Sequence, residues 1–247
     1  MSDTNPYESS VEPQNHTGNM TIFSNLFTAP SLAMTQVQQR YNVLFPLFVM
    51  ILMTALVMVA YFVVLDYAWY LDFLVETTAG ELSKAEQDQQ RSIMEMMSKP
   101  VMGSIAVVTS MVGIAVIYVI QAVYFLIVSN VNNDGYQFKQ WFSFISWTAM
   151  PALLAILAMF VFLFSSSNGQ IAPDSMNPLS LNELFFGLES SKGLGKLLST
   201  IHLPQLWSFA VMVIGYQSWT KSSTVKSAFV VLTPFVLIYL GWYLFFV

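Results

Sequence analysis

Five long hydrophobic runs constrain this chain more than any other feature of its sequence. Residues 43–65 contain no charged side chain, and comparable runs follow at 101–128, 141–164, 203–219 and 227–247. A helix needs about 20 mainly apolar residues to cross a bilayer, and the run at 203–219 is the shortest of the five. The sequence therefore predicts an all-α polytopic membrane protein with five transmembrane helices. Four spans and one re-entrant segment is the alternative.

Composition excludes several classes of protein. Charged residues make up 9% of the 247 residues and hydrophobic residues 55%, whereas soluble domains carry about 25% charged residues. The chain therefore lacks the polar side chains that a water-soluble enzyme needs. The absence of cysteine excludes disulfides and Cys-ligated metals. His16 and His202 are isolated, which predicts no metal site, and the net charge of −5 predicts no nucleic-acid partner.

The positions of the basic residues predict an orientation. An odd number of spans places the two termini on opposite sides of the membrane. Arg40, Lys139, Lys221 and Lys226 lie in short segments close to span ends, whereas the cations of the other side are spread over the longer loops 66–100 and 165–202. Because lysine and arginine in short loops mark the cytoplasmic side, we expect a cytoplasmic N-terminus and an external C-terminus.

Several segments outside the spans carry their own signals. Residues 1–20 are polar, without a cleavable signal peptide, and predict a flexible tail before a membrane domain at 21–247. Apolar residues after Met20 predict a short interfacial helix that ends at Pro30. A capping box at Ser83–Glu86 starts a polar helix that ends near Pro100.

A second capping box, Ser180–Glu183, predicts an amphipathic helix at 181–190. Leu184, Phe185 and Leu188 would lie on its apolar face. This helix would lie on the outer leaflet or against a partner, or it would cover the protein's own bundle.

Aromatic residues gather at the predicted span ends. They are Trp69, Tyr70, Trp141, Trp219, Trp242 and Tyr243. Tryptophan and tyrosine favour the headgroup layer, so we interpret them as interfacial anchors; an aromatic ligand site is the alternative.

Residues that could carry chemistry are scarce inside the spans. No ionisable residue lies well within one, and the motifs of hydrolases, metalloproteases and phosphate-binding loops are absent. We therefore expect no catalytic residue, no cofactor and no enzyme. Gln121 is the most polar residue deep in a span, Pro151 predicts a kink, and Gly103, Ala106 and Ser110 form a small-residue face suited to close helix packing within the bundle or between chains.

Sequence motifs add a resemblance to a known family. They are LFTAP (Leu26 to Pro30), Pro46 near the start of the first span, FKQWFSFISWTAMP (Phe138 to Pro151), and LPQLWSFAVMVIGY (Leu203 to Tyr216) with its Trp207 and Gly215. In this order the chain resembles the Yip1 domain family in its short prokaryotic form, from about Leu26 to the C-terminus. The resemblance implies a five-helix protein of the bacterial inner membrane with a cytoplasmic N-terminus, which acts as a membrane adaptor.

Two functional hypotheses follow. In the first, the protein is a non-catalytic scaffold or accessory subunit whose partners are membrane lipids and other subunits. The resemblance implies an ABC-type exporter, with its permease and periplasmic adaptor, as the partner complex. In the second, it is a small transporter or channel whose pathway is lined by Ser110, Gln121, Ser143, Ser146 and Thr148. In either case we expect Trp207 and Gly215 to serve helix packing.

Overall fold

The computed structural model describes residues 18–247 and shows a helical protein. Its long helices are α3 (Leu44–Val64), α6 (Lys99–Asn132), α7 (Phe138–Thr148) followed by α8 (Leu153–Ser165), α10 (Leu203–Thr220) and α11 (Thr224–Phe246). The shorter ones are α1 (Asn19–Thr28), α2 (Pro30–Arg40), α4 (Tyr67–Ala79), α5 (Lys84–Glu95) and α9 (Gly193–Thr200). Residues 1–17 of the expected tail lie outside the described part of the chain.

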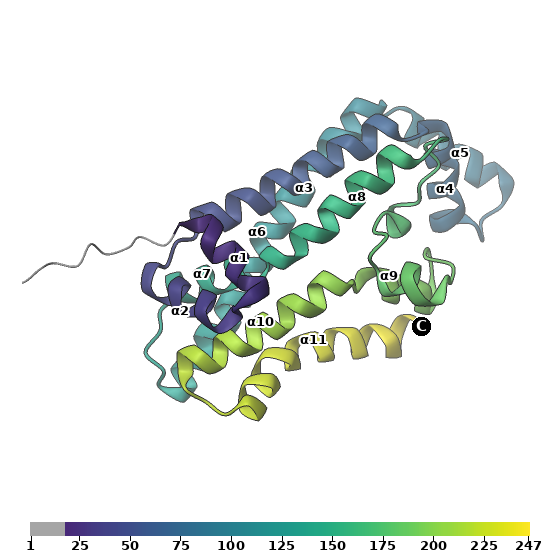
Figure 1. The fold of residues 1–247 in the computed structure, drawn as a ribbon. Helices are drawn as coiled ribbons and strands as arrows, with labels where there is room; N and C mark the ends of the chain where they lie inside the picture. Colours follow the sequence, from purple (N-terminus) through teal and green to yellow (C-terminus); the bar gives the residue numbers. More distant parts are fainter. Residues whose placement is uncertain (1–17) are drawn as a thin grey trace, which may run out of the picture.

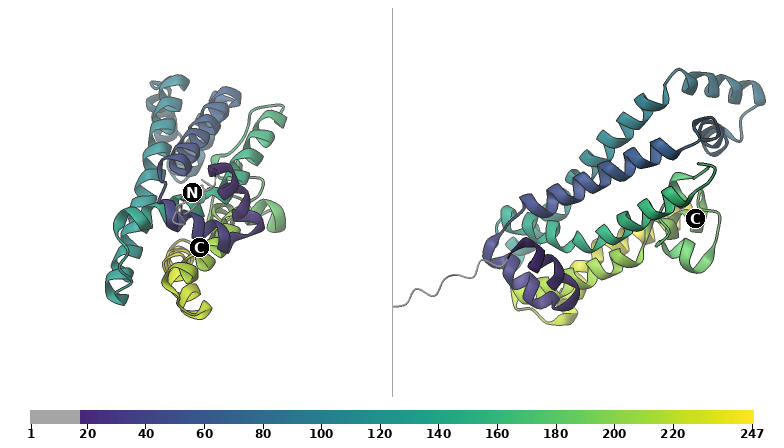
Figure 2. Two further views of the ribbon diagram at one scale, coloured as in Figure 1. Left: turned by 60° about the vertical axis from the view of Figure 1, so that its left-hand side comes forward. Right: turned by 45° about the horizontal axis from the view of Figure 1, so that its top comes forward.

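The long helices run back and forth between two ends of the molecule (Figure 1). At one end, which we call the hairpin end, lie α1, α2 and the connections 133–137 and 221–223. At the other, the loop end, lie α4, α5, the segment 166–202 and the C-terminus. Figure 2 shows α3 and α6 on one side of α8, and α10 and α11 on the other. The segments at the two ends are the same two sets of loops whose basic residues predict the orientation of the chain.

Four helical segments are long and apolar enough to cross a membrane. Within residues 18–247 they are Leu44–Val64, Lys99–Asn132, Phe138–Ser165 and Thr224–Phe246. The expected span at 203–219 forms a helix, α10, at nearly the expected bounds. However, α10 is not among the four, because polar residues such as Gln205, Ser208 and Gln217 lower its mean hydropathy. Four spans are supported, and the fifth is not.

The expected third span is interrupted at Pro151. A 3₁₀ turn, Met150–Ala152, separates α7 from α8. Proline lacks the N–H that an α-helix would use at this position and its ring crowds the preceding turn. The prediction of a kink at Pro151 is confirmed.

The N-terminal segment departs from the prediction. The predicted helix before Pro30 is present as α1, which ends at Thr28. It is followed at once by a second, unpredicted helix, α2, which begins at Pro30, where a missing N–H costs nothing. Ile22 and Leu26 are fully buried against the bundle instead of lying in the headgroup layer. The α1–α2 pair, which we call the N-terminal hairpin, is thus part of the protein core.

The predicted amphipathic helix at 181–190 is also wrong. The expected cap is present, since the Glu183 N–H donates to Ser180 Oγ at 3.2 Å. The helical turn nevertheless covers only Asn182–Phe186, in π geometry, and stops at Gly187, whose φ is +60°. The side chain of Asn182 bonds both the N–H and the carbonyl of Leu188, which closes a compact turn in place of a longer helix.

Two of the expected interfacial anchors lie in the core. Trp141 is 0% exposed and Trp219 is 3% exposed. They pack with Phe125 and Phe144 at the hairpin end, with ring centroids 5.2 Å apart for Phe125 and Trp141 and 5.0 Å apart for Phe144 and Trp219. The anchoring interpretation fails for this pair because the N-terminal hairpin covers the end of the bundle where they lie.

Candidate functional site

The N-terminal hairpin is held to the bundle by tryptophan side chains. The Nε1–H groups of Trp207 and Trp219, both in α10, donate to the carbonyl oxygens of Leu26 at 3.1 Å and Met34 at 2.9 Å. Trp147 of α7 donates to the Asn42 carbonyl at 2.7 Å. The chain after residue 18 is therefore anchored at α1, at α2 and at the link to α3.

Gly215 lies where the hairpin meets α10 and α7. A Cβ atom added at Gly215 would lie 2.8 Å from Cε2 of Phe144 and 2.9 Å from Cγ of Met34. Only glycine permits this approach, so Gly215 sets how closely α2 packs on α10. Trp207 and Gly215 thus both lie at the contact between α10 and the hairpin.

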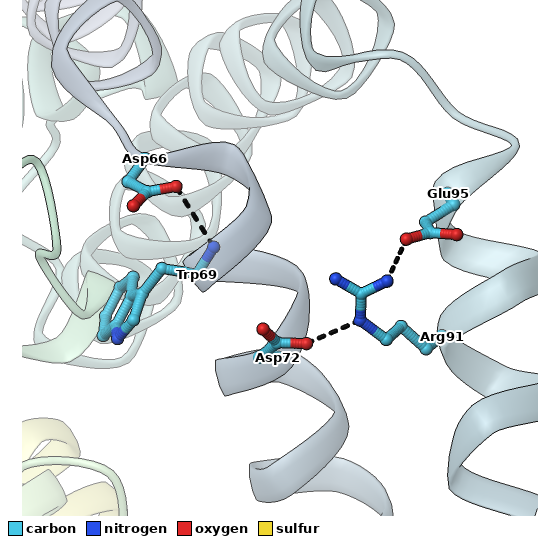
Figure 3. Close-up of polar contacts among 5 residues, drawn as sticks. All are labelled: Asp66, Trp69, Asp72, Arg91 and Glu95. Atoms are coloured by element: carbon cyan, nitrogen blue, oxygen red, sulfur yellow. Dashed lines mark hydrogen bonds and ion pairs between the residues drawn. The ribbon is translucent and has the colours of Figure 1, made fainter.

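The other end of the molecule carries a helical arm formed by α4 and α5. α4 is capped by Asp66, whose Oδ1 accepts the Trp69 N–H at 3.2 Å (Figure 3). α5 begins with the predicted capping box, in which Glu86 Oε2 accepts from the Ser83 N–H at 2.9 Å. α5 ends at Glu95, before the expected end near Pro100, because α6 already starts at Lys99.

One arginine joins the two helices of this arm. Arg91 Nε lies 2.6 Å from Oδ1 of Asp72 in α4, and Arg91 Nη1 also pairs with Glu95 within α5 (Figure 3). Its neighbours, Asp72 above all, raise the pKa of Arg91. α5 itself contains no buried residue. It is held by polar contacts to α4 and leaves its apolar side chains uncovered.

The turn at Asn182–Phe186 forms a second uncovered apolar feature at the loop end. Leu184, Phe185, Phe186 and Leu188 are exposed, Phe185 to 66%. The turn is fixed to the chain before α10, since the Leu181 N–H donates to the Ile201 carbonyl at 2.8 Å. The structure places the predicted residues Leu184, Phe185 and Leu188 on one projecting turn, which neither lies on an extended helix nor covers the bundle.

A small pocket of about 270 Å³ also lies at the loop end. It is lined by Met159, Pro173, Asp174, Met176, Asn177, Ser199, Thr200 and His202. The His202 Nδ1 atom accepts the Gln205 N–H at 3.2 Å and so caps α10, and burial lowers the pKa of His202 to about 4. Ser199 Oγ has no hydrogen-bond partner in the part of the chain that the structure describes, so Ser199 and His202 do not form a nucleophile–base pair.

The small-residue face of α6 meets α3. Gly103 is buried, and a Cβ there would contact the Phe62 ring at 3.0 Å. Ala106 packs against the same core, while the hydroxyl of Ser110 donates to the carbonyl of Val107 in its own helix. The packing at Gly103 is thus within the chain.

The polar residues of the transporter hypothesis lie in α6 and α7. Ser143, Ser146 and Thr148 are buried in α7, and each hydroxyl donates to a main-chain carbonyl. Gln121 is half-buried in α6. Among residues 18–247, no group of three or more His, Asp or Glu side chains is placed to hold a metal ion.

The sequence is similar to one known family over nearly its whole length. The Yip1 domain model matches residues 24–245. The chain belongs to the Yip1 domain family. The expected resemblance is confirmed, and the Yip1 match begins within α1, so the N-terminal hairpin is part of the Yip1 domain. No curated protein and no solved structure matched the chain.

The tryptophan contacts to the hairpin were not predicted from the sequence. One signal for them was present. In a helix the carbonyl of Leu26 would accept from the N–H of residue 30, and Pro30 has none. Pro30 therefore predicts that the Leu26 carbonyl takes a donor from outside its own helix, and the structure identifies that donor as Trp207.

Proposed function

We propose that this Yip1 family member is a non-catalytic membrane scaffold or accessory subunit that assists the assembly or activity of a larger membrane complex. The observation that carries this proposal is the α4–α5 arm, in which α5 contains no buried residue. A helix without buried residues gains little stability from packing against its own protein. The presence of such a helix in the structure is explained if the exposed face of α5 binds another protein.

The arm is built to present apolar side chains. Arg91 fixes α5 to α4 through Asp72, and Ile93, Met96 and Met97 are exposed, Met96 to 85%. Methionine side chains adapt to the shape of a partner. Because the arm is already ordered by its ion pairs and capping box, a partner would lose less entropy on binding it.

The exposed turn at Asn182–Phe186 supplies a second contact at the same end. Phe185 and Phe186 would fit an apolar recess or the lipid surface beside a partner. Two contacts on one side of the membrane suit a subunit that bridges a permease and an external component. The proposed complex is an ABC-type exporter with a periplasmic adaptor.

The proposal includes five membrane passes in a bacterial inner membrane, with the N-terminus in the cytoplasm. α10, with 18 residues, would rise about 27 Å, close to the roughly 30 Å of a hydrocarbon core. Its polar residues would be shielded by α2, α7 and α11. The hairpin end, which carries Arg40, Lys139, Lys221 and Lys226, would face the cytoplasm.

Affinity purification of the tagged full chain from native membranes in mild detergent tests the proposal. Mass spectrometry should recover a permease, its ATPase or a periplasmic adaptor in a fixed ratio to the chain. Recovery of the chain alone, as monomer or homodimer, would contradict the scaffold function and favour a stand-alone transporter.

A pair of arm variants sharpens this experiment. Ile93→Glu places a charge on the exposed apolar face of α5 and should release the partner. Ser92→Glu adds the same charge at an exposed neighbouring position and should retain it. Equal recovery with both variants would contradict a role for α5.

A further inference from the structure

An apolar groove of about 670 Å³ lies between α3 and α6, near the loop end. It is lined by Val59, Phe62, Val63, Lys99, Pro100, Gly103, Ser104, Val107 and Val108. Most of these are valines or other apolar residues, with Lys99 at one end. The groove opens outward, since Val63 and Val108 are exposed. In a membrane-spanning bundle such a surface faces lipid.

Lys99 is the charged group of this groove. It is the first residue of α6, and its Nζ atom donates to the carbonyl oxygens of Leu65 at 2.7 Å and Val63 at 3.3 Å. These carbonyls end α3, where a cation is favoured by the helix dipole. An ammonium group has three N–H donors, and within residues 18–247 Lys99 forms no ion pair. Its charge and one donor are left for an anion.

The depth of the groove fits a phospholipid. Lys99 lies at the ends of α3 and α6, where lipid phosphates would lie. From Lys99 to Val108 the groove follows α6 for about 14 Å, roughly half of a hydrocarbon core. An acyl chain placed along Phe62, Gly103 and Val107 would therefore start at a phosphate beside Lys99.

A second copy of the chain is the competing occupant. A transmembrane helix of another copy would have to bring a carboxylate to Lys99. α3, α6, α7, α8, α10 and α11 contain no aspartate or glutamate. A phosphate supplies the missing charge, and a helix from a second copy does not.

We propose that the groove between α3 and α6 is a phospholipid-binding site, with the lipid phosphate on Lys99 and one acyl chain along Phe62, Gly103 and Val107. This site is independent of the α4–α5 arm and of any partner protein. It would hold one phospholipid at the loop end of the bundle.

Photo-crosslinking of the detergent-purified, delipidated full chain tests this site. The probe is a phosphatidylglycerol that carries a diazirine on one acyl chain. Peptide mapping should place the crosslinks on residues 59–63 and 100–108. Crosslinks spread evenly over the lipid-facing residues 112–127 would overturn the proposal, because they would indicate only a general lipid layer.

Two variants separate the charge from the shape of the groove. Lys99→Met should lower the crosslink yield about fivefold, the effect of one basic residue at a membrane surface. Ser104→Phe fills the groove and leaves Lys99 in place, and it should also lower the yield. Val116→Phe adds the same ring to an exposed position of α6 outside the groove and should not. Unchanged yields in the first two variants would overturn the proposal.

A single-cysteine variant tests the competing occupant. Because the chain contains no cysteine, Ser104→Cys places the only thiol at the groove. Under oxidising conditions in native membranes it should remain monomeric. A disulfide-linked dimer would show that a second copy occupies the groove and would overturn the lipid assignment.

Discussion

The indole Nε1 of Trp207 lies 3.1 Å from the carbonyl oxygen of Leu26 and donates a hydrogen bond to it. Leu26 is near the end of α1, and Pro30 cannot provide the N–H that a helix would direct at this carbonyl. α10 therefore satisfies a main-chain group of α1. The hairpin can turn between α1 and α2 because a residue far along the chain completes its hydrogen bonding.

Trp207→Phe should loosen the N-terminal hairpin. Phenylalanine keeps an aromatic six-membered ring but lacks the indole N–H, so the Leu26 carbonyl is left without its donor, at a cost of about 1–3 kcal/mol. The fraction of monodisperse protein that survives heating in detergent should fall. Trp242→Phe is the control, because the Trp242 indole makes no hydrogen bond within residues 18–247. Equal losses in both variants would contradict a specific role for the Trp207 contact.

Gly215→Ala should be destabilising by about 1–3 kcal/mol. The new methyl group would come within 2.9 Å of Phe144 and Met34, which are both packed in the core. Gly241 in α11 has no atom within 4 Å of its added Cβ. Gly241→Ala should therefore be neutral or slightly stabilising, since alanine favours a helix. Heating in detergent compares the two, and a stable Gly215→Ala variant would show that α2 can move away from α10.

Acid should destabilise the loop end through His202. Burial lowers the pKa of His202 to about 4 from 6.5, so the unfolded chain binds its proton more readily than the folded one. Stability is then complete above about pH 6.5 and is lost as the pH falls towards about 4, by up to roughly 3 kcal/mol.

His202→Asn tests this pH dependence. Asparagine can accept the Gln205 N–H as a helix cap but does not titrate, so the variant should lose less stability between pH 6.5 and 4. Melting in detergent across this range is the measurement. An unchanged loss of stability in this variant between pH 6.5 and 4 would contradict the assignment to His202.

Arg91→Gln should release α5 from α4 without unfolding the bundle. The variant removes the contacts with Asp72 and Glu95, and α5 has no buried residue to hold it in place. Amide hydrogen exchange should become several-fold faster at residues 84–95 and remain unchanged in α3 and α6. Exchange that is unaltered at 84–95 would mean that the capping box and the helix itself suffice.

The sequence alone determined the membrane class, the family and the places of the long apolar helices. Long uncharged runs can bury their main-chain groups in lipid only as helices, so α3, α6, α7–α8 and α11 follow from local composition. The Ser83–Glu86 capping box and the Pro151 kink also follow from neighbouring residues alone, because caps and proline act within one helical turn.

Only the tertiary structure decided what those helices contact. The sequences around Trp141 and Trp219 do not reveal whether these rings face lipid headgroups or the protein core. The docking of the N-terminal hairpin buries both rings. The turn at Asn182–Phe186 is short because the Asn182 side chain captures Leu188 and Gly187 adopts positive φ. Lys99 is placed on the carbonyls of α3 by the packing of α6. Contacts between residues distant in the chain compete with local preference, and in this protein they decide which faces are buried and which remain for lipid and partners.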